Sequence, residues 1–266
     1  MRAFAYFFRW ATTLSFAATA ATLALVPARG DNPAAPAIAC HAPADLIRLV
    51  NPLKRVAHRI AGGQPLTIVA IGSSSTAGAG ASSPALSYPS RLEVELKALF
   101  PRADITVVNR GVNGEESRDM LARFERDVIA EQPDLVLWQV ASNAIMRNRE
   151  LPMQQALIRE GIARLKQTRA DVVLVDPQYT TAVLAQPVAL PTVDLIAAEA
   201  RRQRVGNFRR FALMKDWREN QNIPFETFSI EDGLHMNDWG YDCLARNLAA
   251  AIAASAMPAM ASAQRN

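Results

Sequence analysis

Short apolar runs alternate along the chain with longer stretches in which apolar residues recur at helical spacing. The runs are rich in β-branched residues, which is typical of strands buried on both faces of a parallel sheet. They lie at residues 66–71, 105–109, 135–140 and 172–175, and a further run at residues 225–229 predicts a short fifth strand.

The stretches with helical spacing predict helices that separate these strands. They lie at residues 45–61, 90–100, 117–131, 151–168, 192–204, 208–219 and 238–254, with Ser117 as the expected N-cap of the third. Strands that alternate with helices of this length imply a parallel sheet with right-handed crossovers. We therefore predict an α/β fold, a three-layer α/β/α sandwich around a flavodoxin-like sheet of about five strands.

The N-terminus differs in kind from the rest of the chain. Arg2 and Arg9 precede a nearly uncharged stretch at residues 11–26, which predicts a secretory signal peptide at residues 1–28. The apolar stretch is shorter than the ~20 residues that span a bilayer. An uncleaved anchor is the alternative, and it would be the only expected membrane contact. We expect cleavage near Ala28 and a periplasmic or secreted protein.

Composition suits one globular domain. The chain has 266 residues, of which 50% are hydrophobic and 20% are charged. We place an Ala/Pro-rich linker at residues 29–44, the domain at residues 45–256 and a disordered, low-complexity tail at residues 257–266. The net charge of +4 comes without a basic arm or an aromatic-basic platform, so no nucleic-acid partner is expected.

Arginines gather around the junction of two predicted late helices. A solvated face is the usual meaning of such a cluster, and attraction to an anionic polysaccharide or a membrane surface is the alternative. Its members are Arg201, Arg202, Arg204, Arg209 and Arg210.

The chain has two cysteines, Cys40 in the linker and Cys243 in the last predicted helix. In an exported protein an even pair predicts a disulfide, here one that joins the linker to that helix. Two unpaired thiols are the alternative.

The first predicted strand ends abruptly in Gly72 and three serines, Ser73, Ser74 and Ser75. A loop that follows a parallel strand lies at the carboxyl edge of the sheet, where open α/β folds bind ligands. The hydroxyls therefore stand at the expected position of chemistry. A serine-rich turn that caps the next helix explains the same residues without any chemistry.

The chain has three histidines, so there are few candidates for a catalytic base. His41 lies in the linker and His58 in the first predicted helix, whereas His235 precedes the last helix at the carboxyl edge of the sheet. Asp232 lies three residues before His235 across a glycine, so one tight turn brings the carboxylate to the imidazole. This pairing fixes the tautomer and leaves the second ring nitrogen to take a proton from serine. An ordinary surface loop is the alternative.

These segments together resemble the SGNH hydrolase superfamily, also called GDSL-type esterases and lipases. The segment Val108-Asn109-Arg110-Gly111-Val112-Asn113-Gly114 resembles the second block of that family, and Trp138-Gln139-Val140-Ala141-Ser142-Asn143-Ala144 resembles the third. The resemblance covers residues 66–250. It implies a nucleophile at Ser74 with Asp232 and His235. It also implies an oxyanion hole formed by the N–H groups of Ser74 and Gly114 and the amide of Asn143.

Two positions depart from the family pattern. Ser73 replaces the aspartate that precedes the nucleophile, and Ser142-Asn143-Ala144 replaces Gly-Asn-Asp. The first departure leaves Ser73 and Ser75 open as alternative nucleophiles, and both together indicate a divergent branch with its own substrate.

Competing folds fit less well. An α/β-hydrolase elbow requires Gly-x-Ser-x-Gly, but Thr76 occupies the second glycine position. Gly78-Ala79-Gly80 resembles a dinucleotide loop without its third glycine, and Pro84 interrupts the helix that would bind pyrophosphate. No cysteine or histidine pair has ligand spacing, so neither a metal nor a cofactor is expected.

We therefore expect an exported serine esterase that hydrolyses or transfers an acyl group through an acyl-enzyme on Ser74. An O-acylated carbohydrate or another small ester is the candidate substrate. The alternative is a non-catalytic carbohydrate-binding module on the same fold.

Overall fold

The computed structural model describes Met1 and residues 38–263. The predicted signal peptide after Met1 and most of the predicted linker lie outside the described residues. The sequence from Cys40 onward forms one compact unit.

Five parallel strands form its central sheet, in the order β2-β1-β3-β4-β5. They are β1 (Leu66–Gly72), β2 (Ile105–Gly111), β3 (Leu135–Gln139), β4 (Asp171–Val175) and β5 (Gly206–Phe208). This is the flavodoxin-like order, so the predicted fold class is confirmed. Gly72 pairs with Gly111, and Val175 pairs with both Gln139 and Phe208, so the carboxyl ends of all five strands meet at one edge.

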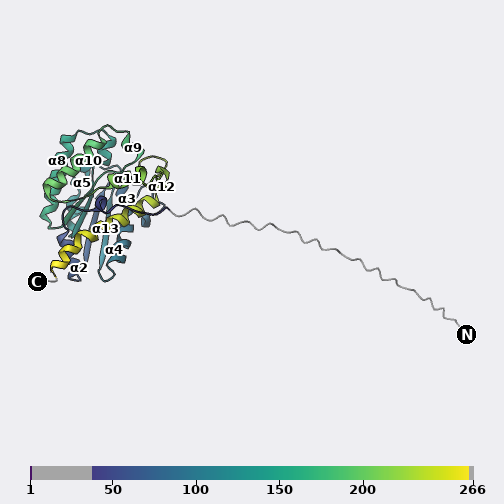
Figure 1. Cartoon of the computed structure of the whole chain (residues 1–266), viewed down its shortest axis with the longest axis horizontal. Helices are drawn as coiled ribbons and strands as arrows, with labels where there is room; N and C mark the ends of the chain where they lie inside the picture. The colour runs from purple at the N-terminus through teal and green to yellow at the C-terminus, as the bar shows by residue number, and fades with distance from the viewer. Residues whose placement is uncertain (2–37, 264–266) are drawn as a thin grey trace. The chain divides into compact units, whose positions relative to one another are not determined.

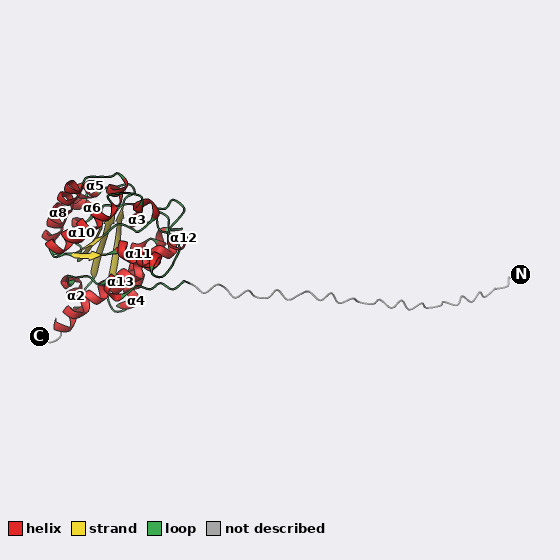
Figure 2. Cartoon of the chain, turned by 45° about the horizontal axis from the view of Figure 1, so that its top comes forward, coloured by secondary structure: helices red, strands yellow, loops and turns green. Residues whose placement is uncertain are grey.

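Helices cover both faces of the sheet (Figures 1 and 2). One face carries α2 (Lys54–Ala61), α4 (Tyr88–Leu99), α11 (Arg210–Glu219) and α13 (Asp238–Ala263). The other carries α5 (Ser117–Ala122), α6 (Phe124–Asp127), α8 (Leu151–Gln167) and α10 (Ala189–Gln203). Alternate side chains of each strand enter opposite cores, as for Ile68 and Val69 of β1, and both side chains are fully buried. In β1, β3 and β4 this two-sided burial explains the continuous apolar runs, whereas the edge strand β2 is only partly buried.

The predicted fifth strand at residues 225–229 is wrong. Those residues begin with the helical turn α12 (Phe225–Phe228), in which the two aromatic rings pack 5.4 Å apart at helical spacing. The fifth strand is β5, which has three residues and leaves no recognisable pattern in the sequence. Gly206 suits this strand because a Cβ there would lie 2.8 Å from Val173 Cγ2 on β4.

Two predicted helices are interrupted. Residues 45–61 form α1 (Ala44–Ile47) and α2, and Pro52 lies between them, where it cannot donate a helical hydrogen bond. Residues 117–131 form α5, α6 and the 3₁₀ turn η2 (Ile129–Glu131). The cap of α5 is also corrected, because Glu116 rather than Ser117 is the N-cap and forms a capping box with Asp119.

The C-terminal helix is longer than expected. α13 continues to Ala263, so most of the segment predicted as a disordered tail is helical. It packs on α4 and α2, and apolar residues such as Leu248 and Ile252 are fully buried there. No helix in the described part of the chain has the length and hydropathy needed to cross a membrane.

The predicted disulfide between Cys40 and Cys243 is confirmed. The two Cα atoms lie 5.4 Å apart, and the bond closes a loop across 203 positions. It ties the start of the compact unit to α13. Cys243 itself is 1% exposed, in the core.

Candidate active site

The serine loop forms a tight turn at the carboxyl end of β1. Ser73 caps the single-turn helix α3 (Ser74–Ala77), and Ser74 is its first residue. Glycine is required at position 72, because a Cβ there would lie 2.1 Å from Thr76 Oγ1 and 2.7 Å from Gln139 Oε1. The turn therefore depends on the close packing of Gly72 against the end of β3.

Three neighbouring serines have three different environments. Ser73 and Ser75 are each 1% exposed, whereas Ser74 is half-buried. Ser73 Oγ donates to Gln139 Oε1 at 3.0 Å, and Ser75 Oγ accepts a hydrogen bond from Arg210 Nη1 at 2.9 Å. Ser74 Oγ instead lies 2.8 Å from His235 Nε2. This geometry favours Ser74 as the nucleophile over the two alternatives.

His235 lies in the loop before α13, at the same edge of the sheet. Its Nδ1 lies 2.5 Å from Asp232 Oδ2. The other carboxylate oxygen accepts the backbone N–H groups of Leu234 and His235 at 2.8 and 2.9 Å. The tight turn requires Gly233, whose φ is 65° and whose added Cβ would lie 2.3 Å from Thr181 Oγ1. The expected contact between Asp232 and His235 is thus present.

The electrostatics of Asp232 suit an ionised orienting group. Partial burial acts to raise the pKa of this carboxyl. Hydrogen bonds from the His235 side chain and from the two backbone N–H groups outweigh burial, so the pKa lies below its ordinary value. The carboxylate therefore stays charged at neutral pH and favours a proton on Nδ1. Nε2 is then left to accept the proton of Ser74.

The two further oxyanion candidates lie in adjoining loops. Asn143 lies on α7 (Ser142–Met146), which follows β3, and its Nδ2 donates one hydrogen bond to Glu115 O at 2.9 Å. Gly114 has a φ of 79°, and its carbonyl accepts a hydrogen bond from Arg147. These contacts hold the two loops together. Among the described residues, the backbone N–H groups of Ser74 and Gly114 have no hydrogen-bond acceptor, as the expected role requires.

A buried arginine supports the loop that carries Gly114. Arg123 is 7% exposed, and its guanidinium binds the carboxylate of Glu115 through Nε at 2.8 Å and Nη2 at 2.6 Å. The same Nη2 donates to Arg110 O at 2.8 Å, at the end of β2. The sequence pattern does not distinguish this arginine from the surface arginines of an amphipathic helix.

Gln139, Gln178 and Arg210 form a buried polar layer beneath the site, and the sequence did not predict this layer. Each is at most 2% exposed. The one available signal is Gln139 at the end of an otherwise apolar strand. Burial of Arg210 also corrects the predicted arginine cluster, because Arg201, Arg202 and Arg204 are exposed and Arg210 lies in the interior.

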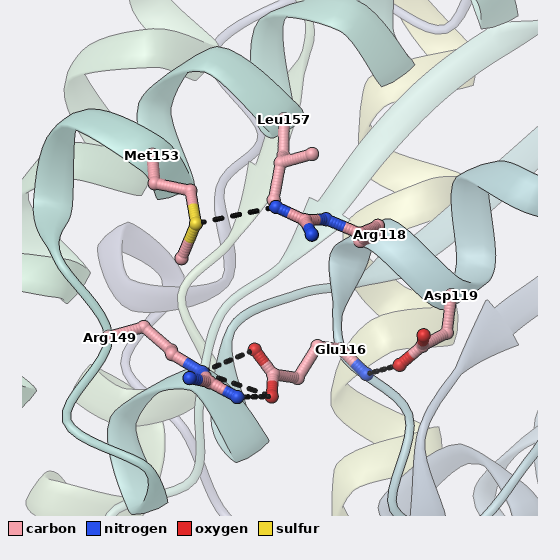
Figure 3. A pocket seen from close by; sticks show the side chains of 6 residues that line it. All are labelled: Glu116, Arg118, Asp119, Arg149, Met153 and Leu157. Atoms are coloured by element: carbon pink, nitrogen blue, oxygen red, sulfur yellow. Dashed lines mark hydrogen bonds and ion pairs between the residues drawn. The ribbon is translucent and has the colours of Figure 1, made fainter.

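Two hollows are lined by Asp232 or by a residue next in sequence to a loop of the site. One has a volume of about 240 Å³ and lies between α5 and α8, where Glu116 binds Arg149 and Arg118 contacts Met153 (Figure 3). The other has a volume of about 660 Å³, and Asp232 and Phe225 are among its lining residues. No cluster of three or more His, Cys, Asp or Glu side chains suited to a metal ion occurs within the described residues.

Comparison with known proteins identifies the family of the chain. The model of the non-GDSL lipase-like family matches residues 39–258. The chain belongs to this family. Its membership, together with the sheet order, confirms the resemblance to SGNH-type hydrolases.

One similar protein of known activity is an acetylxylan esterase of Geobacillus stearothermophilus. It is 33% identical over 94 residues, which are 32% of this chain and 43% of the relative. This chain therefore spans less than half the length of that relative.

Solved structures show the same fold. A two-domain esterase active on acetylated mannans, crystallised with mannopentaose, has a TM-score of 0.64 and 23% identity over 79% of this chain and 56% of its own. The acetylxylan esterase Axe2 of Geobacillus stearothermophilus has a TM-score of 0.61 and 21% identity over 70% of this chain and 94% of its own. Axe2 has been crystallised as catalytic mutants at a serine and at a histidine.

Proposed function

We propose that the protein is a serine esterase that removes an acetyl group from an acetylated carbohydrate. The observation that carries the proposal is the hydrogen-bonded row of Ser74, His235 and Asp232, with distances of 2.8 and 2.5 Å. A hydroxyl, an imidazole and a carboxylate that are hydrogen-bonded in this order can act as nucleophile, general base and orienting group.

Acylation begins when the Oγ of Ser74 attacks the ester carbonyl while its proton passes to His235 Nε2. The Asp232 carboxylate stabilises the imidazolium that forms. The N–H groups of Ser74 and Gly114 and the free N–H of the Asn143 amide stabilise the tetrahedral oxyanion. The oxyanion collapses, the bond to the leaving alkoxide breaks, and the alkoxide takes the proton from His235. An acetyl-serine remains.

Deacylation repeats the sequence with water. The oxygen of the water attacks the acetyl carbon while His235 takes one of its protons. The bond between Ser74 Oγ and the acetyl carbon then breaks, and the proton passes from His235 to Ser74 Oγ. The products are acetate and the free enzyme. A sugar hydroxyl in place of water would make the same site an acyltransferase.

The carbohydrate substrate is supported by the relatives, which are named as active on acetylated xylan or mannan. The hollow between α5 and α8 supports it further. Its two arginines, its two carboxylates and the apolar Met153 and Leu157 suit a sugar, whose hydroxyls bind charged groups and whose ring face is apolar.

We also propose that the protein is exported to the periplasm or the medium. Support comes from the basic and apolar N-terminal pattern and from the disulfide, which persists in oxidising compartments. Mass spectrometry of protein from the cell envelope and medium tests this. A mature N-terminus near residue 29 is expected, and an intact Met1 on all of the folded protein contradicts cleavage.

The decisive assay compares wild type with Ser74→Ala on 4-nitrophenyl esters of increasing acyl length and on acetylated xylo- and manno-oligosaccharides. We expect hydrolysis by the wild type alone, fastest for acetate, with release of free acetate from the oligosaccharides. Acetyl transfer to added sugar without acetate release indicates an acyltransferase. Saccharide binding by a folded wild type that does not hydrolyse any ester supports the binding-module alternative and contradicts the proposal.

A further inference from the structure

Arg210, the first residue of α11, is fully buried beneath the candidate site. Its guanidinium donates four hydrogen bonds, from Nε to Asp176 O at 2.8 Å, from Nη1 to Ser75 Oγ at 2.9 Å, and from Nη2 to Gln178 Oε1 at 2.9 Å and Ser142 Oγ at 3.4 Å. All three nitrogens of the planar fork are therefore engaged.

These contacts reach the three parts of the site. Ser75 follows Ser74 in α3, and Ser142 precedes Asn143 in α7. Gln178 transmits the third contact, because its Nε2 donates to Leu234 O at 3.1 Å, one residue before His235. The guanidinium of Arg210 thus contacts the residue next to the nucleophile and the residue next to the oxyanion amide. It reaches the loop of His235 through the side chain of Gln178.

The charge of Arg210 is costly at this depth. No carboxylate oxygen is among its hydrogen-bond acceptors in the described chain. The nearby Asp176 uses its Oδ1 to accept the Phe211 N–H instead. An apolar side chain of similar volume would fill the space without desolvating a charge. The rigid planar fork, however, can hold several acceptors in fixed relative positions, which neither an apolar chain nor a lysine can do.

We propose that Arg210 is a positioning residue of the esterase site, which holds Ser74, Asn143 and His235 in their relative placement through Ser75, Ser142 and Gln178. This inference rests on the proposed function. Its specific content is that the fork geometry, not the buried charge alone, sustains turnover. A misplacement of about 1 Å among reacting groups is sufficient to slow a reaction roughly 10²-fold.

The test measures kcat and KM on 4-nitrophenyl acetate, the rate of Ser74 labelling by a fluorophosphonate, and the melting temperature. Arg210→Met is expected to lower kcat and the labelling rate about 10²-fold, with KM within about threefold. Arg210→Lys keeps the charge but places all its donors on a single nitrogen. Its kcat is therefore expected to remain at least about tenfold below that of wild type. A folded Arg210→Met or Arg210→Lys with wild-type kcat overturns the proposal.

Gln178→Leu keeps the inference testable if Arg210 variants do not fold, since it cuts the link to Leu234 while the arginine remains. We expect an approximately tenfold lower kcat, and wild-type kcat contradicts the positioning role. Arg159→Met is the matched control, because Arg159 binds the fully buried Glu199 between α8 and α10 through two hydrogen bonds of 3.0 Å. It should lower the melting temperature without changing kcat.

An equal loss of kcat in Arg159→Met assigns the effect to general destabilisation and overturns the inference. Failure of the proposed function has a different signature. In that case the wild-type protein itself neither hydrolyses the ester nor reacts with the fluorophosphonate, and both proposals fall together.

Discussion

The Nε2 atom of His235 lies 2.8 Å from the Oγ atom of Ser74, although the two residues are 161 positions apart in the chain. Ser74 follows β1 at the carboxyl edge of the sheet, and His235 reaches the same edge from the loop between α12 and α13, where Ser229 and Met236 form an antiparallel bridge. The distance is that of a hydrogen bond, so the proposed transfer of the serine proton to the imidazole requires no bridging water.

Loss of either partner should abolish most of the activity. Ser74→Ala and His235→Ala are each expected to lower kcat on the order of 10⁴–10⁶-fold, because nucleophile and base act in one step. For the same reason the double variant should be hardly worse than either single variant. Additive losses in steady-state kinetics would show that the two residues act independently.

The neighbouring serines provide the controls. Ser73→Ala and Ser75→Ala should stay within about tenfold of wild type, since their hydroxyls bind Gln139 and Arg210 rather than His235. Ser75→Ala should lose more activity than Ser73→Ala, because it removes one of the contacts of Arg210. Treatment with a fluorophosphonate and peptide mass spectrometry should place the covalent adduct on Ser74. An adduct on Ser73 or Ser75 would refute the assignment.

Asp232→Ala should cost less than His235→Ala. The carboxylate orients the imidazole and stabilises its charged form, but it does not take the proton of Ser74. We expect a loss of kcat that is smaller by at least about tenfold than that of His235→Ala. Glu231→Ala, which changes the preceding exposed carboxylate, is the control and should retain activity. A loss as large as that of His235→Ala would indicate a direct role in proton transfer.

The amide of Asn143 is expected to act only as charge develops on the substrate. Asn143→Ala should lower kcat about 10²–10³-fold with a smaller change in KM, which is the usual effect of one oxyanion donor. Because Nδ2 also donates to Glu115 O, the melting temperature must be measured alongside. Unaltered kcat in the folded variant would remove Asn143 from the site.

The disulfide should contribute to stability rather than to catalysis. It closes a loop across 203 positions, for which the chain-entropy model gives an upper limit of roughly 5 kcal/mol. The double variant Cys40→Ala/Cys243→Ala should lower the free energy of unfolding by about 2–4 kcal/mol in urea titrations, with kcat retained. Wild-type protein treated with dithiothreitol should match it. Equal stability of the oxidised and reduced proteins would contradict the prediction.

Asp176 should make the protein less stable as the pH rises towards neutrality. Complete burial raises the pKa of this carboxyl to about 7, against the opposing hydrogen bond from the Phe211 N–H and the charge of Arg210. Between the ordinary pKa of aspartate and about 7, the folded state keeps a proton that the unfolded chain has lost. The free energy of unfolding therefore falls as pH rises through this window, and does not fall further above it.

Asp176→Asn removes the titration and keeps an acceptor for the Phe211 N–H. In urea titrations, the free energy of unfolding of the wild type should fall between pH 5 and pH 8. This fall should exceed that of the variant by on the order of 1 kcal/mol or more. An identical pH dependence of the two proteins would show that Asp176 is ionised throughout.

Much of the fold follows from the sequence because each buried parallel strand must be apolar on both faces. The apolar runs of β1, β3 and β4 satisfy this requirement, whereas β2 lies at the edge of the sheet, is mostly half-buried, and carries Asn109 and Arg110 near its end. β5 has three residues, one of them Gly206, and so carries too little pattern to recognise. The aromatic pair Phe225 and Phe228 contributed a run of strand-like residues that packs as a helical turn instead.

The contact between Asp232 and His235 is encoded locally, within one glycine turn, and the serines follow β1 directly. The expectation that His235 lies at the same edge rested on a strand at residues 225–229, which is the helical turn α12 instead. The folded chain brings His235 to Ser74 through the loop between α12 and α13. The sequence alone left three serines as nucleophiles. Their separation required the partners of each hydroxyl, which come from Gln139 on β3, Arg210 on α11 and His235 before α13.

Only the tertiary structure decided which arginines are structural. Arg123 and Arg210 have the same side chain as the exposed Arg201 and Arg202, and no local pattern marks them. Whether a guanidinium lies in water or in the interior depends on acceptors from distant segments: Glu115 and Arg110 O for Arg123, and Asp176 O, Ser75 and Gln178 for Arg210. The sequence determined the four longer strands, the disulfide pair and the contact between Asp232 and His235, because apolar runs, a single cysteine pair and a tight turn act over short range or allow one pairing. The buried polar layer beneath the site was decided by packing, because desolvation of a charge is offset only where the folded chain brings all its acceptors together.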